Sequence, residues 1–322
     1  MQISDVPGIV VDVGFSPNGK HAGIVIADFF GGTRSNALVI WDLENNTEHL
    51  RLDESLHLFE PDPESDEGNY YLWRLEFSPD GSTILTGSLL SSSEDWEVHG
   101  SVVLWDAGTG EVIRTVDKGG DYTAIEYTGD SQRAVVLDGF VPNPNVKVWD
   151  LQTGEMLSAF IDSEHGDDIW MIALHPDEQR LITAATDGTM FMRDLETGEI
   201  IHSFVGHRGG IADIDINTDG TMVISSSFEG EVLLWDVETG ELLRQFTEHQ
   251  ATVWDVDFSP DGQTALSASV DGQIIQWRVA PQSPEEIIEW MKTNRVYRDL
   301  TQEECEQFGL TPTSDVNMVE GG

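Results

Sequence analysis

The sequence predicts an all-β protein built from six copies of one four-stranded sheet. The pattern is plainest over residues 218–278, where an aspartate–glycine turn, a serine and an apolar strand ending in tryptophan occur twice in the same order. The two tryptophans, Trp235 and Trp277, are 42 residues apart. A period of this length is typical of repeat proteins, in which one unit buries its apolar faces only by stacking on a copy.

The same strand ending recurs four more times toward the N-terminus, at residues 38–42, 102–106, 146–150 and 190–194. In the last of these, Arg193 takes the place of the tryptophan. From Trp105 onward the endings are 42 to 44 residues apart. Trp41 and Trp105 are 64 residues apart, which indicates inserted loops between the first two units.

Within each unit, alternation and turn residues indicate four antiparallel strands. In residues 253–258 the apolar Trp254, Val256 and Phe258 alternate with Asp255 and Asp257, as expected for a strand with one buried face. Ser-Pro-Asp-Gly and Thr-Gly-Glu segments supply the tight turns between strands.

Because these motifs recur in phase, residues 2–280 resemble the WD-repeat β-propeller family. The resemblance implies a propeller of six four-stranded blades over residues 1–280, or seven if one blade lies outside the chain. The sixth unit has no fourth strand of its own, because residues 280–284 break the pattern with two prolines. We therefore expect residues 1–4 to supply that strand, as the family's ring closure implies.

Residues 281–322 are predicted to form a short C-terminal helical tail. Acidic residues open the segment 284–294, its apolar positions have helical spacing, and residues 301–304 match a capping box. The tail resembles the one that follows repeat arrays in large bacterial signalling proteins. That resemblance implies an alternative function, a sensor module that regulates a linked effector.

The net charge of the chain limits the kinds of partner that it can bind. The 322 residues include 59 Asp and Glu against 16 Lys and Arg, for a net charge of -43. Such a chain is not expected to bind nucleic acid or an anionic membrane, whereas a basic protein or peptide is favoured. An acidic coat suited to a high-salt habitat is the alternative interpretation. The lone Cys305 and an N-terminus without a signal pattern lead us to expect a cytoplasmic protein, monomeric by default, with no cofactor or metal.

The inserted connections share one end of the predicted ring. They span residues 28–36, 53–69, 87–100 and 138–145, all in units one to three. Long loops on a rigid scaffold often carry function, and aromatic residues in them are typical anchors for a partner. We expect partner-binding residues at Phe29, Phe30, Arg34, Phe59, Trp96 and Phe140. The alternative is that these side chains fold over the gaps between blades.

Units four to six repeat a constellation of histidine, hydroxyl and carboxylate that invites a hydrolase interpretation. Because it recurs in successive units, we interpret it as a structural hydrogen-bond network rather than a catalytic site. Its members are His165, Thr183, Asp187, His207, Ser225, Glu229, Trp235, His249, Ser267, Asp271 and Trp277. Arg193 needs a carboxylate in place of indole packing, and Asp187 is the nearest candidate in sequence.

Two further sets of residues share a register near the predicted channel. Trp73, Trp170 and Trp254 are interpreted as packing between blades, with ligand stacking as the alternative. Asp12, Asp213 and Asp255 follow one position later and could surround a cation, although solvated carboxylates are the simpler interpretation.

The sequence therefore predicts a non-enzymatic scaffold that binds a protein or peptide on the loop-rich face of units one to three. The alternatives from other classes are the sensor module and a small-molecule binder or hydrolase at the channel mouth. The fold alone does not decide between them.

Overall fold

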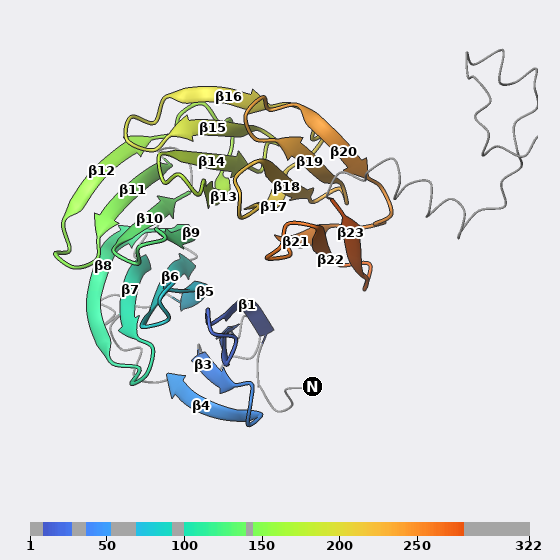
Figure 1. Cartoon of the computed structure of the whole chain (residues 1–322). Coiled ribbons are helices and arrows are strands. Elements are labelled where there is room, and N and C mark those ends of the chain that lie inside the picture. The colour runs from blue at the N-terminus through green and yellow to red at the C-terminus, as the bar shows by residue number, and fades with distance from the viewer. Residues whose placement is uncertain (1–8, 28–36, 53–68, 92–99, 140–143, 280–322) are drawn as a thin grey trace, which may run out of the picture. The chain divides into compact units, whose positions relative to one another are not determined.

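The computed structural model describes residues 9–27, 37–52, 69–91, 100–139 and 144–279. In these ranges the secondary structure consists of strands and turns, and the strands form six antiparallel sheets arranged around a central axis (Figure 1). Five sheets have four strands and the last has three. This confirms the predicted all-β, six-bladed propeller, and each sheet is hereafter called a blade.

The blades follow the chain in order, and their strands lie in sequence from the axis outward. Blade one contains β1 (Ile9–Phe15), β2 (His21–Ala27), β3 (Ala37–Asp42) and β4 (Thr47–Leu52), and blade two contains β5 (Asn69–Phe77), β6 (Thr83–Ser91), β7 (Gly100–Asp106) and β8 (Val112–Gly120). Blade three contains β9 (Tyr122–Tyr127), β10 (Arg133–Asp138), β11 (Asn145–Asp150) and β12 (Met156–Ile161), and blade four contains β13 (Ile169–Leu174), β14 (Arg180–Ala185), β15 (Met190–Asp194) and β16 (Ile200–Phe204). Blade five contains β17 (Ile211–Ile216), β18 (Met222–Ser227), β19 (Val232–Asp236) and β20 (Leu242–Phe246), and blade six contains β21 (Val253–Phe258), β22 (Thr264–Ser269) and β23 (Ile274–Arg278).

Turn chemistry explains why the strands end where they do. In the Thr-Gly-Glu turn of blade five, Gly240 adopts a φ of 71°, a left-handed conformation that glycine tolerates best. The Asp236 carboxylate accepts hydrogen bonds from the amide and hydroxyl of Thr239. The same arrangement joins β15 to β16 and β7 to β8, so one sequence motif produces one repeated turn.

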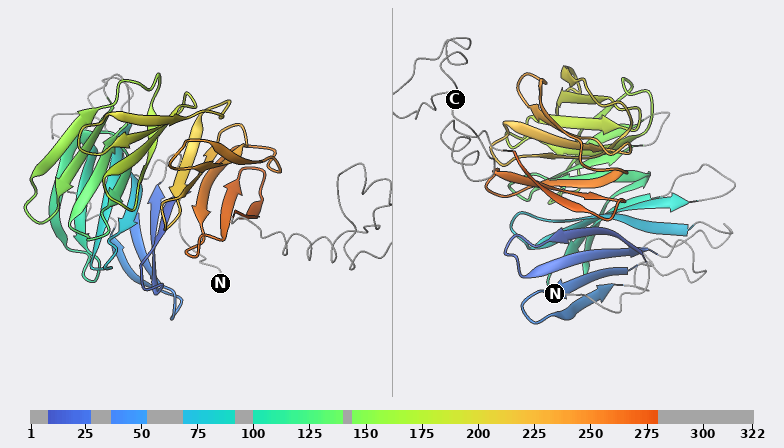
Figure 2. Two further views of the ribbon diagram at one scale, coloured as in Figure 1. Left: turned by 45° about the horizontal axis from the view of Figure 1, so that its top comes forward. Right: turned by 90° about the vertical axis from the view of Figure 1, so that its right-hand side faces the viewer.

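The core lies between neighbouring blades. Apolar side chains of one sheet pack on those of the next, as where Val25 and Leu38 of blade one join Leu75 and Ile84 of blade two in a single buried cluster. Figure 2 shows the sheets standing side by side, so blades two to five each have a neighbour on both faces. Burial of this kind stabilises by roughly 25 cal/mol per Å² of apolar surface.

Two predictions fall outside the described residues. These are the N-terminal strand at residues 1–4 and the helical tail at residues 281–322. Within the described chain, blade six has three strands, and no helix could cross a membrane.

Candidate interaction site

A β-bulge recurs at the same position in the innermost strand of all six blades. The pairing of that strand with the second strand skips one residue in each case. The skipped residues are Val11, Trp73, Thr123, Trp170, Ala212 and Trp254. A bulge leaves its extra residue out of the ladder and redirects the side chain. Three of the six positions thus carry a tryptophan at the mouth of the central channel.

The bulge tryptophans form a chain of aromatic contacts across several blades. The rings of Trp73 and Trp170 meet edge to face at 6.0 Å, although blade three separates their strands. Phe228 lies 6.2 Å from Trp170 and 5.3 Å from Trp254, again edge to face. These distances are typical of favourable aromatic pairs. We call Trp73, Trp170, Phe228 and Trp254 the aromatic cluster; Trp254 is its exposed member, with 52% of its surface accessible.

The aromatic cluster lies at the end of the channel from which the long connections depart. Phe228 follows β18 directly, in the turn that leads to β19. In blades one to three the equivalent turn is replaced by the long connections after β2, β6 and β10. The predicted partner-binding residues Phe29, Phe30, Arg34, Phe59, Trp96 and Phe140 lie on these connections or on the one after β4, outside the described residues. Their placement stays a prediction.

Carboxylates follow the aromatic cluster into the channel. Asp12, Asp213 and Asp255 each come one residue after a bulge position. Burial raises the pKa of Asp12 and of Asp213 above the usual range, and the positive charge of Arg74 opposes the shift in both. Arg74 is held by the carbonyl of Thr123, to which its Nε donates at 2.8 Å. The channel therefore contains more acidic groups than this one guanidinium balances.

Two of these carboxylates and three others bridge one blade to the next by accepting backbone N–H bonds. Their acceptor and donor pairs are Asp12 with Leu75 (2.7 Å), Glu76 with Tyr127 (2.8 Å), Glu126 with Leu174 (2.8 Å), Asp213 with Val256 (2.9 Å) and Asp215 with Phe258 (2.7 Å). Burial raises the pKa of Glu126 to about 8 and that of Asp215 to about 7. We call these contacts the junction bonds, because they join neighbouring blades near the axis.

The networks of blades five and six are built alike. In blade six, Trp277 donates to Ser267 at 2.8 Å, while His249 lies 2.7 Å from the same hydroxyl and 2.9 Å from Asp271. In blade five, the Ser225 hydroxyl accepts from Trp235 at 2.8 Å and lies 2.6 Å from His207.

The carboxylate of the blade-five network differs from the expected one. The structure places Glu231, rather than Glu229, near His207, with 3.5 Å between Glu231 Oε2 and His207 Nδ1. Glu231 stands two residues later, directly before β19, where its side chain also accepts from the Arg208 amide at 3.0 Å. Either residue of this short turn can supply the acid, so the sequence pattern alone did not separate them.

Blade four uses a different set of partners. His165 lies 2.8 Å from the Thr183 hydroxyl and reaches Asp187 through Thr189, at 2.5 Å per step. Arg193, which replaces the tryptophan, donates to the buried Asp162 and not to Asp187 as expected.

Arg193 is almost fully enclosed. It is 1% exposed, and it also donates to the Gly198 carbonyl at 2.9 Å and to Glu164 at 3.3 Å. Asp162 lies 31 positions earlier, just after β12 in blade three, so the ion pair ties two blades together. A pocket of about 530 Å³ opens beside this group, but its charged lining residues, apart from Glu199, already bind one another.

The histidines of blades four and five take part in these networks as neutral groups. Burial lowers the pKa of His165 and of His207 to about 4, so both imidazoles are uncharged at pH 7. Each serine or threonine hydroxyl of the three networks is already bonded on both sides. Among the described residues, no group of three His, Cys, Asp or Glu side chains is placed to hold a metal.

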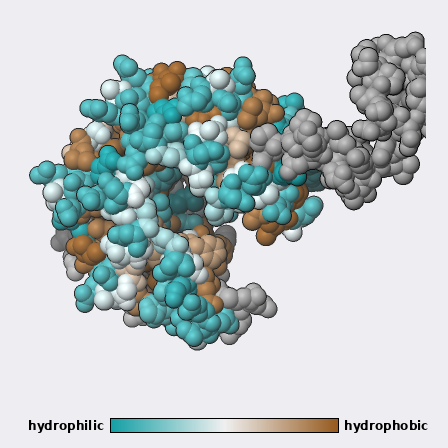
Figure 3. Space-filling view, in the orientation of Figure 1, coloured by the Kyte–Doolittle hydropathy of each residue, from teal (hydrophilic) through white to brown (hydrophobic). Residues whose placement is uncertain are grey.

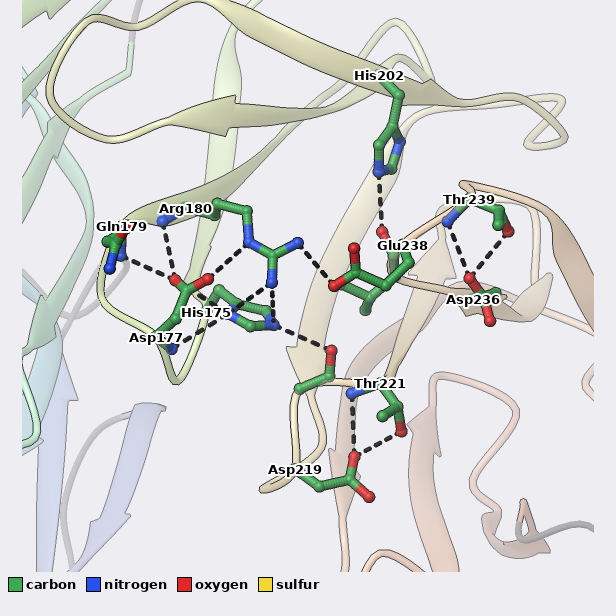
Figure 4. Close-up of polar contacts among 12 residues, drawn as sticks. His175, Asp177, Gln179, Arg180, His202, Asp219, Thr221, Asp236, Glu238 and Thr239 are labelled. Carbon is green, nitrogen blue, oxygen red and sulfur yellow. Dashed lines mark hydrogen bonds and ion pairs between the residues drawn. The ribbon is translucent and has the colours of Figure 1, made fainter.

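The opposite end of the propeller carries short polar turns, and Figure 4 shows the contacts between those of blades four and five. There, Arg180 of blade four donates to Asp177 at 2.7 Å and to Glu238 of blade five at 2.9 Å. His175 lies 3.0 Å from the carbonyl of Gly220, again across the two blades. At this end Arg180 forms ion pairs with carboxylates, whereas Asp12 and Asp213 at the loop-bearing end accept from backbone amides.

Sequence reasoning missed two contributors to these sites. Phe228 was not singled out because only the bulges of other blades bring tryptophans to it. Thr86 of blade two accepts from Trp105 at 2.8 Å, a remnant of the same network. Its register matches Ser267, but the insertion between β6 and β7 hides the spacing.

Comparison with known proteins agrees with the repeats. Residues 157–194, 198–236 and 240–278 match the family described as WD domain, G-beta repeat. Each match starts at or just before the fourth strand of one blade and ends in the third strand of the next, so repeat and blade are offset by one strand.

Several eukaryotic relatives are similar over part of the chain. WD repeat-containing protein 89 homolog of Dictyostelium discoideum is 30% identical over 35% of this chain and 29% of its own length. Serine-threonine kinase receptor-associated protein of Gallus gallus is 27% identical over 47% of the chain and 43% of its length, and WD repeat-containing protein slp1 of Schizosaccharomyces pombe is 29% identical over 29% and 18%. The chain thus spans less than half of each relative, and none of the three supports a bacterial type. Together, the matched repeats, these relatives and the six-bladed propeller support a WD-repeat family for this chain.

Proposed function

We propose that this protein is a non-enzymatic interaction scaffold that binds a protein or peptide at the loop-bearing end of the propeller. The observation that carries the proposal is the aromatic cluster, which ends in the half-exposed Trp254 at the channel mouth. Exposed tryptophans beside a polar rim are typical anchors of protein interfaces. The similar protein of Gallus gallus is named as receptor-associated, which is consistent with a role in protein interaction.

The proposed surface includes the long connections of blades one to three next to the aromatic cluster. Phe29, Phe30, Trp96 and Phe140 are its candidate anchors from the loops.

A basic partner suits the chemistry of this end. Asp255 is exposed next to Trp254 in β21, and the chain as a whole carries a net charge of -43. A lysine or arginine of the partner would gain from this carboxylate and from the faces of the aromatic rings. Steering by the acidic surface would also speed association at low salt.

Selection from a random peptide display library tests this proposal, with the purified protein as bait. We expect enriched peptides to contain lysine or arginine beside apolar residues. Trp254→Ala should weaken their binding at least about tenfold, equivalent to about 1.4 kcal/mol, and the combined Phe29, Phe30, Trp96 and Phe140 to Ala variant should do the same. Leu243→Ala is the matched control, because Leu243 is 51% exposed next to a short turn at the opposite end. Peptides that bind all variants equally would place the site elsewhere.

A further inference from the structure

The pocket beside Arg193 lies at the outer edge of the propeller, between blades three and four. It has a volume of about 530 Å³ and is lined by β12 and by the turn that joins β15 to β16. A volume of this size is typical of sites that bind small molecules. Because the fourth strand of each blade is the one farthest from the axis, the pocket is separate from the aromatic cluster at the channel mouth. The lining residues that matter here are Phe160, Ile161, Glu164, Arg193, Glu199 and Ile200.

A paired exchange of two residues explains why the space is open. In blade five, a Cβ atom on Gly206 would lie 2.7 Å from the Trp235 indole, so the ring requires a glycine there. That indole also packs edge to face on Phe204, at 5.9 Å. The same two positions of blade four hold Asp162 and Arg193. Their ion pair holds the guanidinium in the core, and no indole fills the space beside β12.

Apolar side chains form part of the pocket wall. Ile161 of β12 is 59% exposed, and Ile200, the first residue of β16, is 40% exposed. Phe160 is partly buried and lines the pocket as well. Figure 3 shows hydrophobic side chains at the outer edge of the propeller over β12 and β16. A ligand with an apolar body would remove this surface from water.

The charged groups at the pocket are not balanced. Arg193 supplies one positive charge, and its Nη2 is shared by the buried Asp162 and the exposed Glu164. In the part of the chain that the structure describes, the Glu199 carboxylate has no ion pair or hydrogen bond. Three carboxylates therefore surround one guanidinium. The pocket favours a cation and disfavours an anion.

We propose that this pocket binds a small organic cation, in which a protonated amine is attached to an apolar body. The amine lies beside Glu199 and Glu164, and the apolar body covers Ile161 and Ile200. Arg193 takes no direct part, because its charge is already paired in the core. Its role is to leave the pocket open where the other networked blades have an indole. This site is independent of the protein or peptide site proposed at the channel mouth.

Binding of 2-phenylethylamine to the purified full chain tests the proposal, because this compound joins a primary amine to a phenyl ring. Neutral 2-phenylethanol and the anion 3-phenylpropionate keep the ring and change the charge. All titrations use a Trp254→Ala background, so that the exposed ring at the channel mouth cannot bind the amine. By saturation-transfer difference NMR, we expect the amine to bind at least about tenfold more tightly than the alcohol, and the anion not to bind.

Two variants distinguish this pocket from general attraction to an acidic surface. Glu199→Gln should weaken binding of the amine about fivefold and leave the alcohol unaffected, because the side chain keeps its size and loses its charge. Glu241→Gln is the matched control and should change neither, since Glu241 has the same place in the equivalent turn of blade five. The double variant Arg193→Trp with Asp162→Gly rebuilds the blade-five arrangement. It should abolish binding of the amine by filling the pocket.

Other outcomes would overturn the proposal. Equal weakening by Glu199→Gln and Glu241→Gln would mean that the amine is attracted to the acidic surface as a whole. Equal affinities for the amine and the alcohol would mean that the carboxylates do not select a cation. Unchanged binding in a folded double variant would place the amine elsewhere. If circular dichroism shows that the double variant is unfolded, Glu199→Gln and its control still decide the result.

Discussion

Blades four to six and blades one to three are built from the same type of antiparallel sheet but place their polar side chains differently. In blades four to six, a buried histidine binds a hydroxyl that also binds Trp235, Trp277 or Arg193. Among the described residues of blades one to three, the bond from Trp105 to Thr86 is the remnant of that network, and the Trp149 indole N–H has no partner. The long connections between strands occur only in blades one to three. One half of the ring is thus fixed by internal hydrogen bonds, while the other half carries the loops.

The largest expected effect comes from removing the indole of a networked blade. Trp235→Ala should lower the free energy of unfolding by about 4 kcal/mol, because a fully buried ring is lost and a cavity remains. Trp41→Ala in blade one should cost clearly less, since Trp41 is only half-buried and makes one 3.3 Å bond to Asn46. Urea unfolding of both variants measures the difference, and equal losses would contradict the division of the ring.

Removing Arg193 tests whether blade four depends on its ion pair. Arg193→Met should destabilise by about 3 kcal/mol, because the buried carboxylate of Asp162 would lose its counter-charge. The double variant Arg193→Met with Asp162→Asn should recover part of that loss. Thermal unfolding followed by circular dichroism reports both values. No recovery in the double variant would mean that the arginine acts through packing alone.

A smaller effect is expected for the hydroxyl that links two partners. Ser267→Ala should cost about 2 kcal/mol, because both Trp277 and His249 lose their bond to it. Thr86→Ala is the comparison in blade two, where the hydroxyl accepts a hydrogen bond from Trp105. It should cost about half as much. Urea unfolding of the two variants measures the difference, provided that their m-values are equal. A larger shift of the midpoint for Ser267→Ala would show that the second hydrogen bond adds stability.

The pH dependence of stability sharpens the comparison at the junctions. The pKa of Glu126 is about 8 in the folded protein, well above its ordinary value of 4.5, because the side chain is buried. The folded state therefore holds this proton more tightly than the unfolded chain. Its contribution is complete below about pH 4.5 and declines as the pH rises through 8, with a slope of up to about 1.4 kcal/mol per pH unit.

Glu126→Gln removes that dependence, because a glutamine oxygen can still accept from the Leu174 amide but does not ionise. We expect the variant to lose less stability than the parent between pH 5 and pH 8. Unfolding free energies at the two pH values measure this. Parallel curves for parent and variant would mean that Glu126 is already ionised in the folded state.

The repeat period predicted most of the fold, whereas contacts set by neighbouring blades were harder to predict. Trp235 and Trp277 recur in phase, so strand order and blade number followed from sequence. The carboxylate partners did not, because Glu231 and Glu229 flank one turn and Asp162 comes from the preceding blade. The tryptophans at the channel mouth were interpreted as packing between blades, and the bulges that bring them into contact with Phe228 depend on strand pairing.

The junction bonds run in one direction around the axis. In each of the five junction bonds, the acceptor belongs to the earlier blade and the amide to the later one. Blade five shows what this direction means for a single unit, because its Asp213 and Asp215 both accept from the blade that follows it. A copy of such a unit would bring its acceptors for the following blade with it, and the direction of bonding around the axis would be kept.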